Sequence, residues 1–339
     1  MRYIGVDLHK DNFVVCYMGK GTEEKRFEKY KLLEIGKFIK TLNKEDILAV
    51  ESTTNVKYFR KKVKDYVSRV IVVNPRKFKI ISESTKKTDK NDAELLAYYA
   101  SKEMLPEVRI KDDAYVEIES LTNTRNKLVE LRSSLKNKIH NLLLSQGILT
   151  KKEQFSSDKS LEKVLEYEEL SETVRFELKI IVNQILSLNE SIKEIDKKLE
   201  ELGKSLSGFT NITSIKGIGT KTGITLLAVI GNINDFENEK KLFSYFGLVP
   251  TIHHSNNKKI NGHITKRGSK LGRKVLIQST LIAIKYSPYL RDFYTRLRMK
   301  KGNGKAIIAT SRKLLKIIYL TLKYNLVFED FSNFVIKAA

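Results

Sequence analysis

The sequence predicts an α/β domain with a mixed sheet, then a long helical linker, then a mainly α-helical C-terminal domain. Residues 1–110 alternate short apolar runs of strand length with segments of helical spacing, which is typical of an α/β layer. Residues 112–204 carry a heptad pattern of leucine and isoleucine. After that pattern, helical segments alternate with glycine-containing turns. We therefore expect domains at residues 1–110, 111–205 and 206–339.

The strands and helices of the first domain follow from apolar runs and turn signals. The expected strands are residues 2–8, 12–18, 24–30, 46–51 and 69–73. The expected helices are residues 32–42, 56–66 and 89–102. His9-Lys10-Asp11 forms the turn between the first two strands, and Asn74-Pro75 ends the last one.

The heptad pattern predicts two long helices. The first carries a leucine at every seventh position, and the second continues the pattern in steps of three and four. The residues of the pattern are Leu121, Leu128, Leu135 and Leu142, then Leu178, Ile181, Ile185, Leu188, Ile192, Ile195, Leu199 and Leu202. A lone helix cannot bury such a stripe, so a coiled coil or an antiparallel hairpin is expected. Packing within one chain and self-association both remain open.

The third domain begins with a Gly-x-Gly turn between two apolar helical segments, within residues 212–232. The turn Gly217-Ile218-Gly219 would let backbone N–H groups approach a phosphate, as in helix-hairpin-helix DNA-binding elements. A plain packing corner between two helices explains the same residues. Residues 239–246, 269–286 and 304–322 are expected helices, and residues 250–268 an expected glycine- and asparagine-rich loop.

The charge of the chain is strongly positive. Sixty-three Lys and Arg against forty Asp and Glu leave a formal net charge of +23. Residues 251–325 hold eighteen Lys or Arg and one acid, Asp292. Such a stretch repels itself unless a polyanion is near, so we expect it to bind nucleic acid. An anionic membrane surface fits less well, because the stretch is not one basic amphipathic helix.

Other classes of protein are disfavoured. No run approaches the roughly 20 apolar residues of a membrane span, and the N-terminus lacks a signal-peptide pattern. Cys16 is the only cysteine, so neither an intrachain disulfide nor a zinc cluster is expected. These features predict a cytoplasmic protein without a membrane partner.

Four acids of the first domain could form a metal site. Asp7 lies near the end of the first expected strand, Glu51 ends the fourth, and Asp89 and Asp92 start a helix on one face. Carboxylates at strand ends point into the crevice where α/β sites form. Together the acids could hold two Mg²⁺ ions for phosphoryl transfer. Singly, each could instead cap a helix or face solvent.

The motifs resemble a known family of recombinases. Three segments, IGVDLHKD, AVES and KKTDKNDAELLAYYA, resemble the RuvC-like DEDD domain of a family of insertion-sequence transposases. This is the IS110 family, whose members are relatives of the Piv-type invertases. The second, transposase domain of that family resembles SIKGIGTKTGITLLAVIG and then FGLVPTIHHSNNKKINGHITKRGSKLGRKVL. The resemblance spans nearly the whole chain in order. It implies a RuvC/RNase H-like first domain, with Asp7, Glu51, Asp89 and Asp92 as the Mg²⁺ ligands.

The resemblance also implies a serine nucleophile. It makes Ser255, five residues after Pro250, the attacking group, with Ser269 and Ser279 as alternatives. Family members have glycine directly after this serine, whereas Asn256 follows here. Asparagine tolerates left-handed backbone geometry better than most residues, so the turn can be retained.

A serine hydroxyl needs a base or a metal for activation. No acid lies between Gly247 and Arg291, so the surrounding segment supplies no carboxylate base. We expect activation by the metals of the first domain in a composite site, or by His253 or His254. Attack would leave a phosphoserine linkage that conserves the energy of the phosphodiester. The chain has no Walker-type loop, which agrees with rejoining without ATP.

The expected partners are nucleic acids and further copies of the chain. The resemblance implies a structured guide RNA encoded by the same element, which pairs with donor and target DNA. The coiled coil suggests a homo-oligomer, a dimer or a tetramer. A basic helix face, with Lys127, Lys136 and Lys138 beside two arginines, could bind phosphates or be solvated. The candidate nucleic-acid-binding residues are Arg125, Arg132, Lys216, Gly217, Gly219, Lys221, Lys258, Lys259, Lys266, Arg267 and Arg273.

Three functions compete at this point. The first is a DNA recombinase that uses both the four acids and Ser255. The second is a hydrolytic nuclease or Holliday-junction resolvase, in which metals activate water and no covalent intermediate forms. The third is an architectural binder without catalysis, which the presence of all four acids and the serine disfavours.

Overall fold

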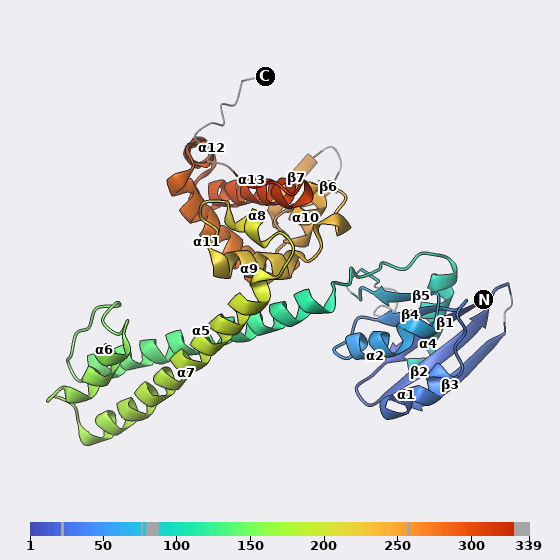
Figure 1. The fold of residues 1–339 in the computed structure, drawn as a ribbon, viewed down its shortest axis with the longest axis horizontal. Coiled ribbons are helices and arrows are strands. Elements are labelled where there is room, and N and C mark those ends of the chain that lie inside the picture. The colour runs from blue at the N-terminus through green and yellow to red at the C-terminus, as the bar shows by residue number, and fades with distance from the viewer. Residues whose placement is uncertain (22–23, 76, 79–87, 256–257, 329–339) are drawn as a thin grey trace. The chain divides into compact units, whose positions relative to one another are not determined.

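The computed structural model divides the chain at Ile110 into two units, Met1–Ile110 and Lys111–Ala339 (Figure 1). It describes residues 1–21, 24–75, 77–78, 88–255 and 258–328. Each unit contains its own clusters of buried apolar side chains. Within the described residues no helix is long and apolar enough to cross a membrane.

A five-stranded mixed sheet forms the centre of the first unit, as the sequence predicted. Its strands are β1 (Arg2–Leu8), β2 (Asn12–Gly19), β3 (Lys25–Lys31), β4 (Ile47–Glu51) and β5 (Arg69–Val73). The spatial order is β3-β2-β1-β4-β5. The first three strands pair antiparallel, while β4 pairs parallel with both β1 and β5.

Helices cover both faces of this sheet. One face packs on α4 (Asp89–Ser101) through its apolar side chains, which include Ala93 and Ala97. The opposite face packs on α1 (Ile35–Ile39) and α2 (Val56–Val63). Short 3₁₀ turns, η1 (Leu32–Glu34) and η2 (Lys64–Tyr66), flank these helices. The three layers explain why the central strands are apolar on both faces.

Two long helices, α5 (Asp113–Ser145) and α7 (Glu172–Lys204), lie side by side in the second unit (Figure 1). They run antiparallel, since Arg125 pairs with Asp196 while Lys138 pairs with Glu177. Most of the α7 stripe is buried as its spacing requires. Leu202 is an exception, because 36% of it is exposed. The buried members of the stripe are Leu178, Ile181, Ile185, Ile192 and Leu199.

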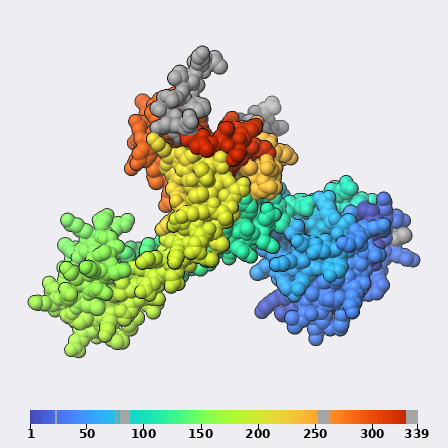
Figure 2. Space-filling model, viewed as in Figure 1, coloured from blue at the N-terminus to red at the C-terminus, as the bar shows by residue number. Residues whose placement is uncertain are grey.

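The segment between the two long helices closes their far end. It contains α6 (Asp158–Glu162) and η3 (Lys163–Glu166). Phe155 and Leu161 are buried against Ile139, Leu143 and other side chains of the pair. The space-filling view shows this segment packed over the end of α5 and α7 (Figure 2).

The rest of the second unit is mostly helical and encloses a second apolar core. Its helices are α8 (Phe209–Thr213), α9 (Thr220–Ile230), η4 (Ile233–Asp235), α10 (Glu239–Tyr245), α11 (Lys270–Tyr286), α12 (Pro288–Lys301) and α13 (Asn303–Lys323). The helix α9 is buried along most of its length, which agrees with its apolar sequence.

Two features of the second unit differ from the sequence-based expectation. The prediction of a loop at residues 250–268 was wrong, because β6 (Pro250–Ser255) and β7 (Lys258–Ile264) form an antiparallel pair there. Polar residues interrupt both strands, so no apolar alternation signals them in the sequence. The helix α12 was also missed, since its basic residues conceal its apolar stripe.

Candidate functional site

Asp7 and Glu51 lie beside each other at one edge of the sheet. The parallel strands β1 and β4 pair with Val6 opposite Val50, and Asp7 and Glu51 are the next residue on each strand. Side chains alternate along a strand, so Asp7 shares the face of Tyr3 and Gly5, which is the face that α4 covers. The two carboxylates therefore reach the α4 side of the sheet.

The first turn of α4 carries the other two acids, Asp89 and Asp92, to this side of the sheet. Thr88 is the N-cap, and its side-chain oxygen accepts a hydrogen bond of 3.2 Å from the Asn91 N–H. The acids occupy the positive end of the helix dipole, where negative charge stabilises the helix.

The close approach of α4 to β1 requires a glycine on the strand. A Cβ atom on Gly5 would lie 1.9 Å from the Ala93 carbonyl oxygen and 2.6 Å from the Ala97 nitrogen. Only a residue without a side chain allows this contact. Gly5 thus sets the distance between Asp7, two residues further along the strand, and the acids of α4.

The four acids of the first unit influence one another electrostatically. Burial raises the pKa of Asp7 above its usual value, and the nearby charges of Asp92 and Asp89 raise it further. Burial likewise raises the pKa of Glu51, with added contributions from Asp7 and Asp92. Each acid therefore interacts with at least one other. A divalent cation would relieve this repulsion, and carboxylate oxygens are the ligands that Mg²⁺ prefers.

His9 belongs to the same cluster, although it was not among the site residues expected from the sequence. Its Nε2 lies 3.0 Å from Asp7 Oδ2 and 3.4 Å from Asp89 Oδ1. One ligand atom each from His9, Asp7 and Asp89 lie within 4.8 Å of one another. The signal in the sequence was the Asp-x-His spacing at the end of a strand, where alternate side chains point to the same side.

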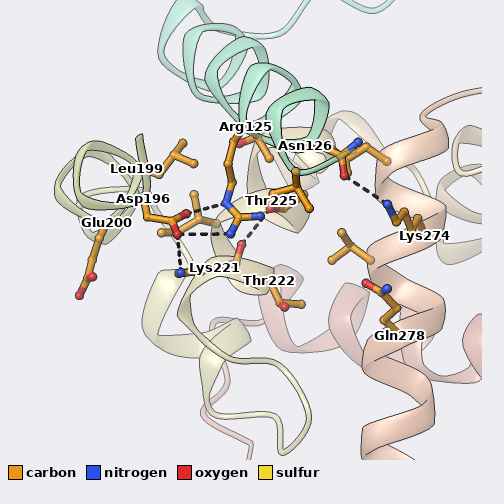
Figure 3. A pocket seen from close by; sticks show the side chains of 15 residues that line it. Arg125, Asn126, Asp196, Leu199, Glu200, Lys221, Thr222, Thr225, Lys274 and Gln278 are labelled. Atoms are coloured by element: carbon orange, nitrogen blue, oxygen red, sulfur yellow. Dashed lines mark hydrogen bonds and ion pairs between the residues drawn. The ribbon is translucent and has the colours of Figure 1, made fainter. Parts of the chain in front are cut away.

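Several of the predicted nucleic-acid contacts have partners within the second unit. Asp196 of α7 accepts hydrogen bonds from Arg125 Nε and Lys221 Nζ, each at 2.5 Å (Figure 3). Arg132 donates to the side chain of Asn189 at 2.9 Å. These cations hold the long helices to each other and to α9, and their role in binding phosphates stays a prediction.

The residues around Asp196 line a cavity of about 240 Å³. Its walls come from α5, α7, α9 and α11, and Lys274 of α11 donates to the side chain of Asn126 across it (Figure 3). Much of the basic face expected on α5 serves to pack this unit, since Lys136 donates to the Phe155 carbonyl.

The Gly-x-Gly turn precedes α9, as expected from its spacing. Gly217 has a positive φ of 101°, and a Cβ there would lie 2.8 Å from the nitrogen of Ala283 in α11. It is therefore needed for helix packing. Gly219 is the N-cap of α9, and a Cβ added to it would meet no atom within 4 Å. Lys216 beside this turn is exposed.

The candidate nucleophile Ser255 is the last residue of β6, and its backbone pairs with that of Lys258 in β7. Lys259 is paired with His254 in the same ladder. The side chains of residues 252–261 lie outside the part of the structure that is described, and so do Asn256 and Asn257 entirely.

The two alternative serines have structural roles. Ser269 caps α11, because its Oγ accepts a hydrogen bond of 3.0 Å from the Gly272 N–H. Ser279 is buried within α11 and donates to the Val275 carbonyl at 3.0 Å. Both roles disfavour them as nucleophiles.

The remaining predicted basic residues surround the base of the β6–β7 hairpin. Lys266 and Arg267 are exposed. Arg273 is partly buried and donates to the carbonyls of Phe246 and Gly268 at 3.2 and 3.3 Å. Gly268 has a positive φ of 102° and packs against the Tyr245 carbonyl.

Two family models match the chain. A model described as transposase, of the DEDD type, matches residues 4–148, and the model described as transposase of the IS116/IS110/IS902 family matches residues 210–295. Together they include all four acids and Ser255. The matches thus cover the sheet unit and the segment with the β6–β7 hairpin.

Similar proteins match over nearly the full length. The transposase for insertion sequence element IS1111A of Coxiella burnetii is 24% identical, over 95% of this chain and 90% of that protein. The pilin gene-inverting protein of Moraxella bovis is 27% identical, over 96% of this chain and 97% of that protein. A probable family 20 transposase of Pseudomonas aeruginosa is 22% identical, over 94% and 96%. The chain therefore belongs to the IS116/IS110/IS902 family of DNA transposases.

Proposed function

We propose that the chain is the recombinase of an insertion sequence, and that it cleaves and rejoins DNA by Mg²⁺-dependent phosphoryl transfer to Ser255. The observation that carries the proposal is geometric: Asp7 and Glu51 follow paired residues of β1 and β4, and the first turn of α4 brings Asp89 and Asp92 to the same side of the sheet. The net charge of +23 supplies the attraction to nucleic acid that such chemistry requires.

The four acids form a donor set that fits divalent cations. Burial, with smaller contributions from the neighbouring acids, raises the pKa of Asp7 and of Glu51, and a bound cation would favour the charged carboxylates. Two Mg²⁺ ions held by these acids would supply positive charge that stabilises an in-line phosphoryl displacement. The four acids would hold and orient these ions, and His253 or His254 is the alternative source of a base for Ser255.

In the proposed reaction the Ser255 Oγ attacks a phosphorus atom of the DNA backbone and loses its proton. The bond from phosphorus to one deoxyribose oxygen breaks, and that oxygen leaves as a strand-end hydroxyl after taking up a proton. The resulting phosphoserine diester conserves the bond energy. A hydroxyl of the second strand then attacks the same phosphorus, so that the strands are rejoined and Ser255 is regenerated.

The fold supports a finer assignment of parts. Three antiparallel strands followed by two parallel ones, in the order β3-β2-β1-β4-β5, fit a RuvC/RNase H-like domain at residues 1–110. The buried stripe of α7 against α5 fits a coiled-coil linker at residues 111–205. The turn before α9 fits a helix-hairpin-helix element in a transposase domain at residues 206–339.

We expect Ser255→Ala to abolish strand exchange while DNA binding and folding persist, because only the nucleophilic oxygen is removed. The measurement is recombination of a supercoiled substrate, together with denaturing-gel detection of a protein–DNA adduct. Ser134→Ala, at an exposed position of α5, is the matched control and should recombine normally. Normal exchange by Ser255→Ala would exclude a covalent role for this serine. Adduct-free cleavage with free 5′-phosphate ends would instead favour a metal-dependent nuclease.

The proposed partners are DNA, a structured guide RNA and further copies of the chain. Phe176 and Ile180 lie one turn apart on α7 and are 67% and 50% exposed, which supports association of the long helices into a dimer or tetramer. We expect one protected RNA, encoded beside the gene, to survive a nuclease challenge of protein purified from its native host. Recovery of only scattered cellular RNA would contradict guidance and favour a recombinase that reads DNA directly.

A further inference from the structure

Hydrogen bonds of its backbone hold His9 in position. The turn between β1 and β2 is closed by a hydrogen bond of 2.9 Å from the His9 N–H to the Asn12 carbonyl. Asn55 Nδ2 donates to the His9 carbonyl at 2.8 Å, and the Asn55 side chain is itself held by Thr53. These bonds fix the turn that carries the imidazole ring, and a metal ligand needs such a preorganised position.

The side chain of His9 points into the acidic cluster. Its Nε2 lies 3.0 Å from Asp7 Oδ2 and 3.4 Å from Asp89 Oδ1, although 49% of the side chain is exposed. Neighbouring ligands of an octahedral ion with bonds of about 2.1 Å lie about 3.0 Å apart. The two distances from Nε2 therefore suit adjacent ligands of one ion as well as they suit hydrogen bonds.

A further oxygen lies on the same side of the sheet. Asn12 precedes Val14 and Cys16 on the face of β2 that packs on α4. Its Oδ1 is buried and has no hydrogen-bond partner among the described residues. Buried acceptors without a partner are uncommon, and an unfilled cation site is one explanation for them.

We infer that His9 supplies Nε2 as a ligand to the divalent ion, and that the site prefers Mn²⁺ to Mg²⁺ because it combines nitrogen with carboxylate oxygens. The inference rests on the metal function proposed above for the four acids, and it extends their ligand set by one residue. Imidazole nitrogen is a ligand of transition metals, whereas Mg²⁺ prefers oxygen. A ligating nitrogen carries no proton, so Nε2 would bind the ion through its lone pair.

The test compares binding of Mn²⁺ and of Mg²⁺ to the metal-free full-length protein by titration calorimetry. Pulsed electron paramagnetic resonance of bound Mn²⁺ reports directly whether nitrogen is coordinated. We expect the wild type to show nitrogen coupling. His9→Ala should lose it, with a fall in Mn²⁺ affinity of about tenfold or more and little change for Mg²⁺. Lys10→Ala, at the exposed neighbouring position, is the control and should behave as the wild type.

The other outcomes separate this inference from the proposed function. Persistent nitrogen coupling in His9→Ala, or an unchanged ratio of the two affinities, would overturn the role of His9 but not that of the acids. Tighter metal binding by His9→Ala would also overturn it, because His9 would then be a counter-ion that competes with the metal. Failure of the wild type to bind either ion would overturn the metal function itself. His9→Asn and a thermal melt show whether a loss of affinity reflects misfolding.

Discussion

Asp7→Asn is expected to reduce strand cleavage by roughly a thousandfold while leaving DNA binding intact. Asp7 lies 3.0 Å from His9 in the cluster, and the charges of His9, Asp92 and Asp89 all act on its pKa. Metal ions stabilise such transition states by several kcal/mol, and about 1.4 kcal/mol corresponds to a factor of ten in rate. Single-turnover cleavage of a labelled substrate measures the loss.

The same substitution should stabilise the metal-free protein at neutral pH. Because the pKa of Asp7 is raised on folding, the native state binds this proton more tightly than the unfolded state does. The free energy of unfolding therefore falls as pH rises from the ordinary aspartate range through the raised pKa. Asparagine has no such ionisation, so the melting temperature of metal-free Asp7→Asn should exceed that of the wild type at pH 7.

Addition of Mg²⁺ should reverse the order of the two melting temperatures, so that the wild type melts above Asp7→Asn. Binding to the native state alone stabilises it by about 2.7 kcal/mol at a concentration of 100 times Kd. The wild type should gain this stability and Asp7→Asn should gain little. Asp65→Asn, at an exposed acid of η2, should leave the melting temperature of the metal-free protein and its stabilisation by Mg²⁺ unchanged. A full Mg²⁺ response in Asp7→Asn would show that Asp7 does not hold the metal.

Gly5→Ala is expected to impair the site without touching any acid. The added methyl group would overlap the backbone of α4 at the Ala93 oxygen, so the helix must move away from β1. Overpacking of this kind typically costs about 1–3 kcal/mol. Because α4 carries Asp89 and Asp92, the shift should weaken Mg²⁺ binding and lower cleavage by about a hundredfold. Thermal melts, calorimetric titration and cleavage rates measure these effects.

Gly36→Ala provides the matched control for this prediction. Gly36 is an exposed residue of α1 with no atom within 4 Å of an added Cβ, so alanine should be neutral or slightly stabilising there. A Gly5→Ala protein with normal stability and normal metal affinity would mean that the β1–α4 contact does not position the acids.

The fold class followed from the sequence where local patterns are strong. Apolar runs predicted β1, β2, β4 and β5, and helical spacing predicted the helix that begins at Asp89 and the two long helices, all of which the structure contains. The third strand was also expected, although β3 is mostly polar. The β6–β7 hairpin did not follow, because its residues are mostly polar and backbone pairing between distant residues leaves no local period. The basic helix α12 was missed for a similar reason.

The four acids could be selected from the sequence because each stands at the end of a strand or the start of a helix, and because the motifs around them resemble those of known transposases. The bonding partners of the arginines could not be predicted from the sequence in this way. Arg125 pairs with Asp196, 71 residues away, and nothing local distinguishes it from a solvated cation. Such pairing depends on how the long helices pack.

The sequence by itself determined the strands and helices of the first unit, the two long helices and the strongly basic character, and it selected the four acids as candidates, because these depend on residue type and local spacing. Only the tertiary structure decided that β1 and β4 are neighbours, that α4 lies on Gly5, and that His9 joins the cluster. These features arise from contacts between residues far apart in the chain. The acids of β1, β4 and α4 come together only when the helix packs on the sheet, so no single segment of the sequence reveals that they meet.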